Sequence, residues 1–197
     1  MRLTKQDKKK LTEKVRAGAA LAFRERGYDG VSLDDLMKQS GLTRGAFYAH
    51  YKSKRALFED VARYEHPLLR MLKQRTGDSP EDLRDQLFEI FFGYLSPENL
   101  EEVFVGCSLA SLTGDITRAP KPVKAAHELA FRDILTEMAR GQNCDPEKLT
   151  ACLVLATGAV STAHAMPKGR SRDAILEQAR TVFLHLAESA ISNDHNK

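Results

Sequence analysis

The chain has 197 residues, of which 42% are hydrophobic and 29% are charged. This length allows one globular domain, or a small module joined to a larger one, and is too short for a barrel enzyme. The composition excludes wholesale disorder and a fibrous structure. Three unevenly spaced cysteines do not form a disulfide framework, which fits a reducing cytoplasm. No stretch has the length and apolar character of a membrane span, so we expect no membrane partner.

The formal net charge of +3 is unevenly distributed along the chain. Residues 1–63 hold 15 Lys/Arg and 8 Asp/Glu, a balance of +7, whereas residues 64–197 hold 15 and 19, a balance of −4. A basic N-terminal part favours binding to a polyanion, because neutralising phosphates releases counterions. The alternative is a basic face that is merely solvated, and charge alone does not decide between the two.

Apolar residues recur at helical spacing and no segment alternates at period two, so the predicted fold is all-α. A first helix is expected to end at Gly27. Ser32 should cap a short second helix that Gly41 ends. Thr43 should cap a third helix, which runs to about His50. Two short helices are thus expected to meet across a tight glycine-containing turn.

Ser53 is predicted to begin a fourth helix, with Leu57, Val61 and Tyr64 facing inward, and Pro67 to break it.

Further along the chain, Ser79 and Pro80 should open another helix, followed by a looser stretch over residues 96–105. Residues 106–117 suggest a short helix and residues 120–139 a longer one.

Asp145 and Pro146 should start the next helix, and Ser171 should cap the last one after a short loop. The predicted organisation is a helix-turn-helix domain over residues 1–52, a connecting helix over 53–75, and a larger helical body over 76–197.

The segment from Ser32 to His50, SLDDLMKQSGLTRGAFYAH, has the dimensions of a DNA-reading helix-turn-helix. Its interior residues would be Leu33, Leu36, Leu42 and Phe47. The outward face of its second helix would then show Thr43, Arg44, Gly45 and Tyr48.

These residue types suit a DNA groove. Arg44 offers a planar fork for guanine or for a phosphate, Gly45 admits close approach, and the Thr43 methyl can touch thymine. Phosphate contacts are expected at the flanks, from Ser32, Tyr48, His50, Tyr51 and Lys54. Taken singly, each has a plainer alternative, since Tyr48 or Tyr51 could belong to the core.

Four segments, RGY at 26–28, SLDDL at 32–36, SGLTRGAFY at 40–48 and HYKSKRALF at 50–58, resemble the DNA-binding domain of the tetracycline-repressor (TetR) family. The resemblance covers roughly residues 9–60. It implies a homodimeric transcriptional regulator, usually a repressor, with a three-helix DNA-binding head and a variable ligand-binding and dimerisation body. The expected partners are a palindromic duplex operator and a small-molecule effector, in the cytoplasm at the nucleoid, with no cofactor.

The two closing helices, residues 146–166 and 171–191, form a predicted antiparallel hairpin. Small residues along the first would let another helix approach closely, so two copies of the hairpin would make a four-helix bundle. The alternative is that both helices pack only on their own body.

The body holds an aromatic population able to line an apolar effector pocket. The candidate pocket residues are Phe88, Phe91, Phe92, Phe104, His127 and Phe131. Aromatic residues at helical spacing can equally be plain core. The histidines are scattered and show no metal-ligand spacing, so no metal site is expected.

Cys107 is the sharpest single candidate in the body, because a helix start would lower the pKa of its thiol. The Gly106–Cys107 pair resembles a branch of the family that includes sensors of reactive electrophiles. A redox- or electrophile-responsive repressor is therefore an alternative function, and an inert buried cysteine is the plainer interpretation. A small helical enzyme is a further alternative, but the sequence lacks a phosphate-cradling glycine loop and a recognisable nucleophile with a base, so no enzyme is expected.

Overall fold

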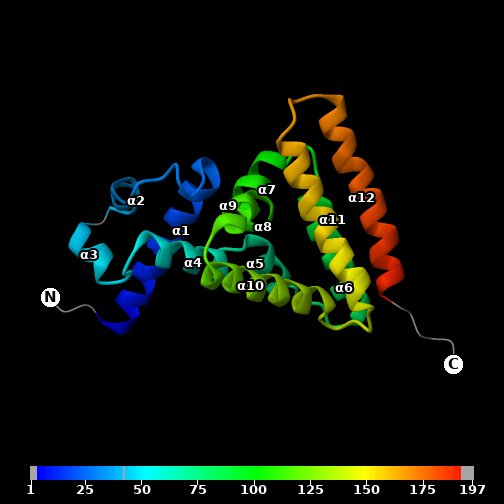
Figure 1. Ribbon diagram of the computed structural model, residues 1–197. Coiled ribbons are helices and arrows are strands. Elements are labelled where there is room, and N and C mark those ends of the chain that lie inside the picture. Colours follow the sequence, from blue (N-terminus) through cyan, green and yellow to red (C-terminus); the bar gives the residue numbers. More distant parts are fainter. Residues whose placement is uncertain (1–3, 42, 192–197) are drawn as a thin grey trace. The chain divides into compact units, whose positions relative to one another are not determined.

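The computed structural model describes residues 4–41 and 43–191, and over this part the protein is helical with no sheet strand (Figure 1). The all-α prediction is confirmed. Leu42, which was expected inside the helix-turn-helix, lies outside the described residues. The side chain of Phe104, one of the candidate pocket residues, is also not among those that the structure describes.

The helices in chain order are α1 (Lys5–Arg26), α2 (Leu33–Ser40), α3 (Arg44–Tyr48), α4 (Lys54–Tyr64), α5 (Pro67–Lys73), α6 (Pro80–Tyr94), α7 (Leu100–Gly106), α8 (Ser108–Ser111), α9 (Thr113–Arg118), α10 (Lys121–Ala139), α11 (Pro146–His164) and α12 (Arg170–Ala190).

The described residues form two compact units. The first, here called the N-terminal unit, comprises the chain up to His66 together with Ser111–Ala130. The second, the C-terminal unit, comprises Pro67–Ala110 and the chain from Phe131 onward. Helix α10 contributes residues to both units. The three-part division of the sequence, with boundaries after residues 52 and 75, stays a prediction.

Hydroxyl caps begin α2, α3 and α4 of the N-terminal unit where the sequence predicted them. The hydroxyl of Ser32 accepts a hydrogen bond from the amide of Asp35, whose carboxylate bonds the Ser32 amide in return, which fixes the start of α2. Thr43 and Ser53 cap α3 and α4 in the same way, through a single bond each. Gly41 ends α2 with φ 67°, a left-handed conformation that glycine adopts without strain.

The core of the N-terminal unit centres on Phe23 of α1 and Phe58 of α4, which meet edge to face with ring centroids 5.1 Å apart. Residues distant in sequence complete this core, because Leu112, Ile116 and Val123 belong to the same buried cluster. The unit therefore buries apolar residues from both of its chain segments.

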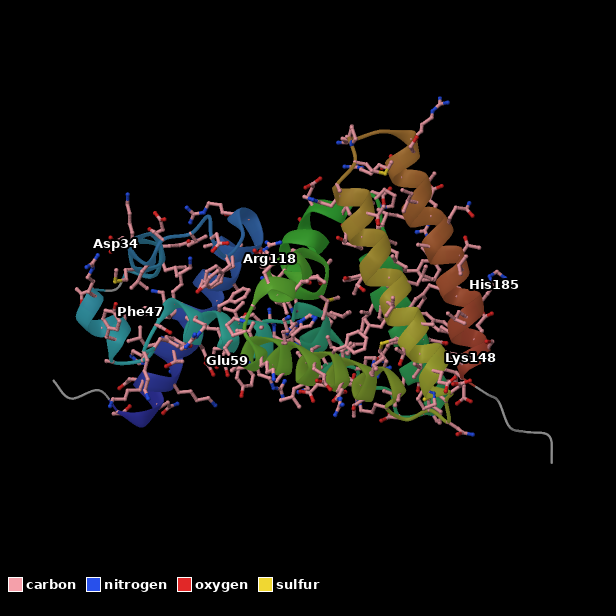
Figure 2. The ribbon with its side chains drawn as sticks, in the orientation of Figure 1. Asp34, Phe47, Glu59, Arg118, Lys148 and His185 are labelled. Atoms are coloured by element: carbon pink, nitrogen blue, oxygen red, sulfur yellow. The ribbon has the colours of Figure 1, made fainter. Side chains whose placement is uncertain are left out.

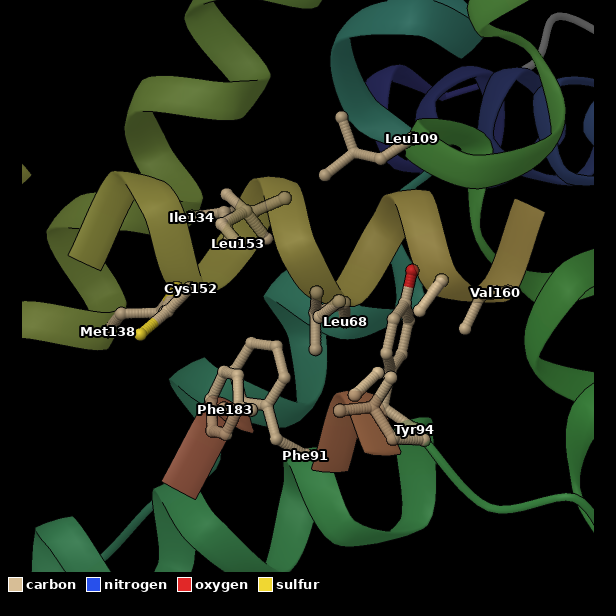
Figure 3. Packing of buried hydrophobic residues seen from close by; sticks show 14 of the residues in the cluster. Leu68, Phe91, Tyr94, Leu109, Ile134, Met138, Cys152, Leu153, Val160 and Phe183 are labelled. Atoms are coloured by element: carbon tan, nitrogen blue, oxygen red, sulfur yellow. The ribbon is translucent and has the colours of Figure 1, made fainter. Parts of the chain in front are cut away.

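The C-terminal unit has a separate core, in which the rings of Phe91 (α6) and Phe183 (α12) stack at 4.4 Å (Figure 3). Helices α11 and α12 pack against each other as the predicted hairpin. Asp145 caps α11 through the amides of Glu147 and Lys148, and Pro146 follows the cap as the sequence predicted.

Several sequence expectations differ from the structure. The looser stretch predicted over residues 96–105 contains α7, which Leu100, 1% exposed, anchors in the core. The single helix predicted over residues 106–117 is divided into α8 and α9.

Ser171 does not cap α12, because the helix already begins at Arg170, after Gly169, and no side chain caps it.

Candidate nucleic-acid interface

Helices α2 and α3 meet across the turn at Gly41 and form a helix-turn-helix, with Asp34 and Phe47 marking the two helices in Figure 2. Leu36 and Phe47 are 3% and 1% exposed, and Leu33 is half-buried against the same core. These side chains hold the two helices together on their inner side, as the sequence predicted.

The outer side of α3 presents the predicted residues to solvent. Thr43, Arg44 and Gly45 are exposed, and the ring of Tyr48 is 56% exposed. A glycine beside an arginine on a short exposed helix leaves room for a close approach of the backbone to a partner. This face can therefore offer hydrogen-bond donors to a flat or grooved surface.

Arg44 does not extend freely into solvent, because its guanidinium forms an ion pair with Asp34 of α2. Nη2 lies 2.8 Å from Oδ1 and 3.0 Å from Oδ2, and Nε lies 3.2 Å from Oδ1. Hydrogen bonding to the Asp34 carboxylate raises the pKa of Arg44 above its ordinary value. This partner is not evident from the sequence, since the two residues are ten positions apart and meet only through the turn.

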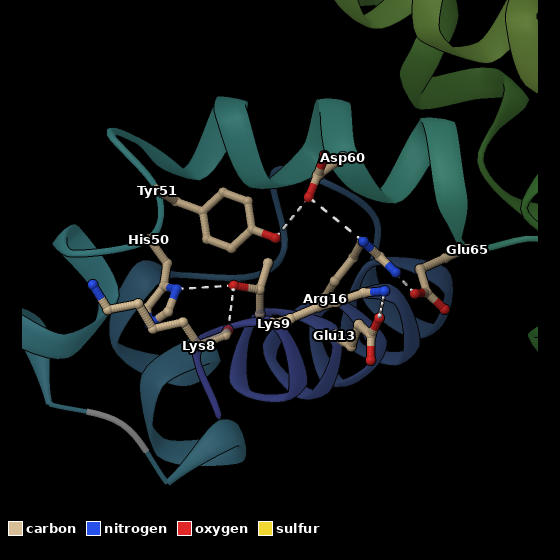
Figure 4. A network of polar contacts seen from close by, with 9 residues as sticks. Lys8, Lys9, Glu13, Arg16, His50, Tyr51, Asp60 and Glu65 are labelled. Atoms are coloured by element: carbon tan, nitrogen blue, oxygen red, sulfur yellow. Dashed lines mark hydrogen bonds and ion pairs between the residues drawn. The ribbon is translucent and has the colours of Figure 1, made fainter. Parts of the chain in front are cut away.

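The residues that follow α3 are held against α1 and α4. The Tyr51 ring is 6% exposed, and its hydroxyl donates a 2.8 Å hydrogen bond to Asp60 (Figure 4). His50 lies with Nδ1 2.9 Å from the Thr12 hydroxyl of α1. A phosphate contact by either residue stays a prediction, and for Tyr51 it would compete with Asp60.

Two further predicted contact residues have partners within the unit. The Lys54 ammonium lies 4.1 Å from the ring centroid of Tyr28. Desolvation lowers the pKa of this lysine, although the negative charges of Asp29 and Asp115 act in the other direction. The hydroxyl of Ser32 is engaged in the cap of α2. Arg44 and Tyr48 of α3 are thus exposed, whereas Lys54 is half-buried.

The candidate effector-pocket residues occupy different surroundings. Phe91 is fully buried, whereas Phe88 and Phe131 are partly buried at the edge of the C-terminal core. Phe92 is 40% exposed beneath the Arg180 guanidinium. His127 belongs to the N-terminal unit, where burial lowers its pKa. An effector pocket formed by these residues stays a prediction.

Cys107 lies between α7 and α8 and is 4% exposed. The Tyr94 hydroxyl donates a hydrogen bond to its sulfur at 2.9 Å. Both residues line a cavity of about 290 Å³ in the C-terminal unit. The other lining residues are Pro67, Leu68, Met71, Ile90, Gly93, Asn99, Glu102 and Gly106. The cysteine is a candidate from the sequence alone, but the cavity is not, because its walls come from segments far apart in the chain.

The α11–α12 hairpin carries a shallow apolar groove of about 640 Å³. Val154 and Val182 are 55% and 50% exposed in it, and the small residues Gly158 and Ala159 also line it. Its other lining residues are Leu155, Thr162, Ala174, Ile175, Gln178 and Ala179. An apolar surface of this kind is typical of a protein contact.

The fold and the interface define an all-α protein with an N-terminal helix-turn-helix. The family model of the bacterial regulatory proteins, tetR family, matches residues 15–61, which span α2 and α3. Residues 15–61 are thus similar to the DNA-binding part of the tetR family, as the sequence resemblance indicated.

Two curated relatives match part of the chain. The biofilm operon icaADBC HTH-type negative transcriptional regulator IcaR of Staphylococcus aureus (strain Newman) is 28% identical over 108 residues, covering 49% of this chain and 58% of IcaR. The uncharacterized HTH-type transcriptional regulator YuxN of Bacillus subtilis (strain 168) is 24% identical over 137 residues, covering 68% of this chain and 47% of YuxN. The chain thus spans about half the length of these relatives.

Solved structures share the fold over nearly the whole chain. The reduced form of Escherichia coli NemR superposes with a TM-score of 0.69 at 18% identity, covering 95% of this chain and 100% of NemR. A TetR-family transcriptional regulator from Agrobacterium tumefaciens gives a TM-score of 0.64 at 15% identity, covering 94% and 100% of the two chains.

The described residues contain no group of three or more His, Cys, Asp and Glu side chains arranged to hold a metal ion. Over the same part of the chain, no helix has the length and apolar character needed to cross a membrane.

Proposed function

We propose that this protein is a DNA-binding transcriptional repressor that acts as a homodimer on a palindromic operator and is released by a small-molecule effector. The observation that carries the proposal is the α2–α3 unit, which buries Leu36 and Phe47 and exposes Arg44 and Tyr48 on the opposite side. The match of residues 15–61 to the tetR family model and the description of IcaR as a negative transcriptional regulator support it. Its place of action would be the nucleoid in the cytoplasm, and we assign it no catalytic role.

Each protomer would place the N-terminal end of α3 in a major groove, with the two half-sites one helical turn, roughly 34–36 Å, apart. The basic balance of residues 1–63 would add phosphate contacts that strengthen binding at low salt. An effector that favours a dimer with wrongly spaced reading helices would lower DNA affinity. By linkage, the operator would weaken effector binding by the same factor.

The second copy would pack on the α11–α12 groove. Two hairpins related by a twofold axis would cover Val154 and Val182 of both protomers and form a four-helix bundle. Small side chains along α11 would allow the close approach that such a contact needs. This pairing would fix the distance between the two copies of α3.

The test of DNA binding is a footprint on the DNA upstream of the gene, followed by titration of the protected duplex with wild-type protein and Arg44→Ala. We expect a palindromic footprint and a loss of affinity on the order of tenfold or more for the variant. Arg118→Ala is the matched control, because Arg118 is an equally exposed, ion-paired arginine of the same unit that lies outside the helix-turn-helix. Equal binding by Arg44→Ala and the wild type would show that α3 does not read DNA.

A second candidate mode of release is covalent and depends on Cys107, which lines the 290 Å³ cavity beside the Tyr94 hydroxyl. An α,β-unsaturated carbonyl compound that enters the cavity would form a bond between Sγ and its β-carbon, and the thiol proton would end on its α-carbon. Adduct formation would change the packing around Tyr94.

The test of this mode is release of operator DNA by such an electrophile from wild-type protein, Cys107→Ser and the control Cys144→Ser. We expect release to disappear only in Cys107→Ser, with its DNA affinity retained. Release from all three proteins would remove Cys107 from the mechanism.

A further inference from the structure

Arg44, the first residue of the proposed reading helix, is already held by an acidic residue of the other helix. We propose that Asp34 is a positioning residue for DNA recognition: its carboxylate fixes one edge of the Arg44 guanidinium, so that the other edge reads a guanine of the operator. This inference rests on the proposed function and deepens it, since it states which base each half-site carries opposite Arg44.

The pair uses only part of the guanidinium. Asp34 accepts hydrogen bonds from Nε and Nη2, which form the side edge of the group. The end edge, formed by Nη1 and Nη2, faces away from this carboxylate. Because the guanidinium is planar and rigid, fixing the side edge also fixes the direction of the end edge.

The carboxylate stands on a firmly held backbone. Asp34 lies in the first turn of α2, next to the reciprocal hydrogen bonds that join Ser32 and Asp35. The dipole of α2 favours a negative charge at this place. Gly41 then turns the chain so that Arg44 starts α3 opposite Asp34. The sequence thereby supplies an anchored acceptor for a long side chain that would otherwise sample many rotamers.

Guanine is the base that fits the remaining edge. Its O6 and N7 atoms are two acceptors side by side in the major groove, matched by two parallel N–H groups of arginine. Residues at the N-terminal end of the second helix are the ones that reach base edges in a helix-turn-helix. A bidentate contact of this kind discriminates between bases by roughly 5- to 150-fold.

Charge favours base reading over phosphate binding at this position. Asp34 neutralises Arg44, so the pair adds little to the non-specific attraction of the N-terminal unit for phosphates. The two side chains are 71% and 67% exposed, and exposed ion pairs contribute little to folding stability. Removing the carboxylate should therefore change what the protein reads while leaving the fold intact.

The experiment begins with selection of binding sites from a pool of random duplex DNA by the full-length wild-type chain. The affinities of wild-type protein and Asp34→Asn are then measured for the selected site and for each single-base change in it. We expect the wild type to prefer guanine at one position of each half-site. In Asp34→Asn this preference should fall on the order of tenfold, while affinity for sites lacking that guanine is kept or raised.

Three further variants isolate the role of the pair. Arg44→Lys keeps the positive charge but loses the fork, and should lose the same guanine preference. In the Arg44→Lys background, Asp34→Asn should have no further effect on that preference, which is the signature of coupled residues. Glu25→Gln, which removes one negative charge from the exposed side of α1, should shift affinity for all sites alike and leave base preference unchanged.

The outcomes separate the inference from the proposed function. Failure of the wild-type chain to select any DNA would refute both. Selection of a defined site whose base preferences are the same in Asp34→Asn, or in Arg44→Lys, would refute the positioning role alone. A uniform rise in affinity for every sequence in Asp34→Asn would do so as well, since it would mean that the carboxylate only repels phosphates.

Discussion

Tyr51 and Asp60 connect the end of the helix-turn-helix to α4: the phenol hydroxyl donates a 2.8 Å hydrogen bond to the carboxylate. Arg16 of α1 stands on the other side of this carboxylate, 3.8 Å from Asp60, and 2.8 Å from Glu65 (Figure 4). The pKa of Tyr51 is raised above its usual range, mainly by desolvation and to a smaller extent by the hydrogen bond to Asp60. The chain segment after α3 is thereby held by a buried ring with a satisfied polar tip.

Replacement of Tyr51 by Phe should therefore destabilise the protein. The variant keeps the ring in the core but removes one hydrogen bond to a charged, partly exposed acceptor, so the free energy of unfolding should fall by about 1 kcal/mol. Urea unfolding followed by circular dichroism measures this difference. Tyr48→Phe is the control, because the Tyr48 ring is exposed, and its stability should match the wild type. Equal stability of all three proteins would contradict the prediction.

His66 should make the protein sensitive to acid. The imidazole is 2% exposed, and Nε2 donates to the Ala62 carbonyl at 2.8 Å. Burial lowers its pKa to about 4, from about 6.5 in the unfolded chain. Above pH 6.5 the His66 imidazole is neutral in both the folded and the unfolded state, so stability is not reduced by its protonation. As the pH falls from 6.5 to 4 only the unfolded state gains the proton, so up to about 3 kcal/mol of stability is lost.

Urea unfolding at several pH values between 4.5 and 7.5 measures this loss. The pH dependence should be weaker in His66→Gln, which keeps an N–H donor but does not titrate. His185→Gln, on the exposed side of α12, should retain the wild-type slope. The same slope in all three proteins would show that His66 does not titrate with unfolding.

Val182 should be essential for dimer formation. It is 50% exposed in the apolar groove of α11 and α12, where a second copy would bury it. A buried unpaired charge is costly, so Val182→Arg should be a monomer at concentrations where the wild type is a dimer. Light scattering after size exclusion measures the mass. Leu129→Arg, at a similarly exposed position of α10, should remain a dimer. A wild-type monomer, or a dimeric Val182→Arg, would refute the proposed interface.

The three cysteines should differ in reactivity at pH 8. Cys152 is fully buried and its pKa is raised to about 11, so little thiolate forms. Cys144 is only partly buried and should react first with a maleimide, while Cys107 should react later, by way of its cavity. Peptide mass spectrometry after timed labelling gives the order. In strong denaturant the three cysteines should react at similar rates. Similar rates in the native protein would contradict the burial of Cys107 and Cys152.

Helix starts and ends were predictable from sequence where the determinants are local. Ser32, Thr43 and Ser53 cap through amides three residues ahead, and Gly41 supplies a conformation other residues avoid. Short-range bonds of this kind can be recognised from the residue type and spacing alone.

Features that depend on tertiary contacts were not predictable in this way. Tyr64 was expected inside but is 52% exposed, with the Arg16 guanidinium 5.0 Å from its ring centroid. The pairing of Asp34 with Arg44 depends on the angle between α2 and α3. The cavity at Cys107 depends on residues of three helices, α5, α6 and α7, and of the two connections on either side of α7.

The N-terminal unit also has a practical consequence for anyone who wishes to isolate its DNA-binding part. Leu112, Ile116 and Val123 pack in the same core as Phe23, yet they follow Phe23 by about ninety positions or more. A fragment that stops at residue 66 would expose the apolar surface these side chains normally cover. Such a fragment should aggregate or unfold at a lower temperature than the full chain. A stable isolated DNA-binding fragment would need a substitute for the missing segment.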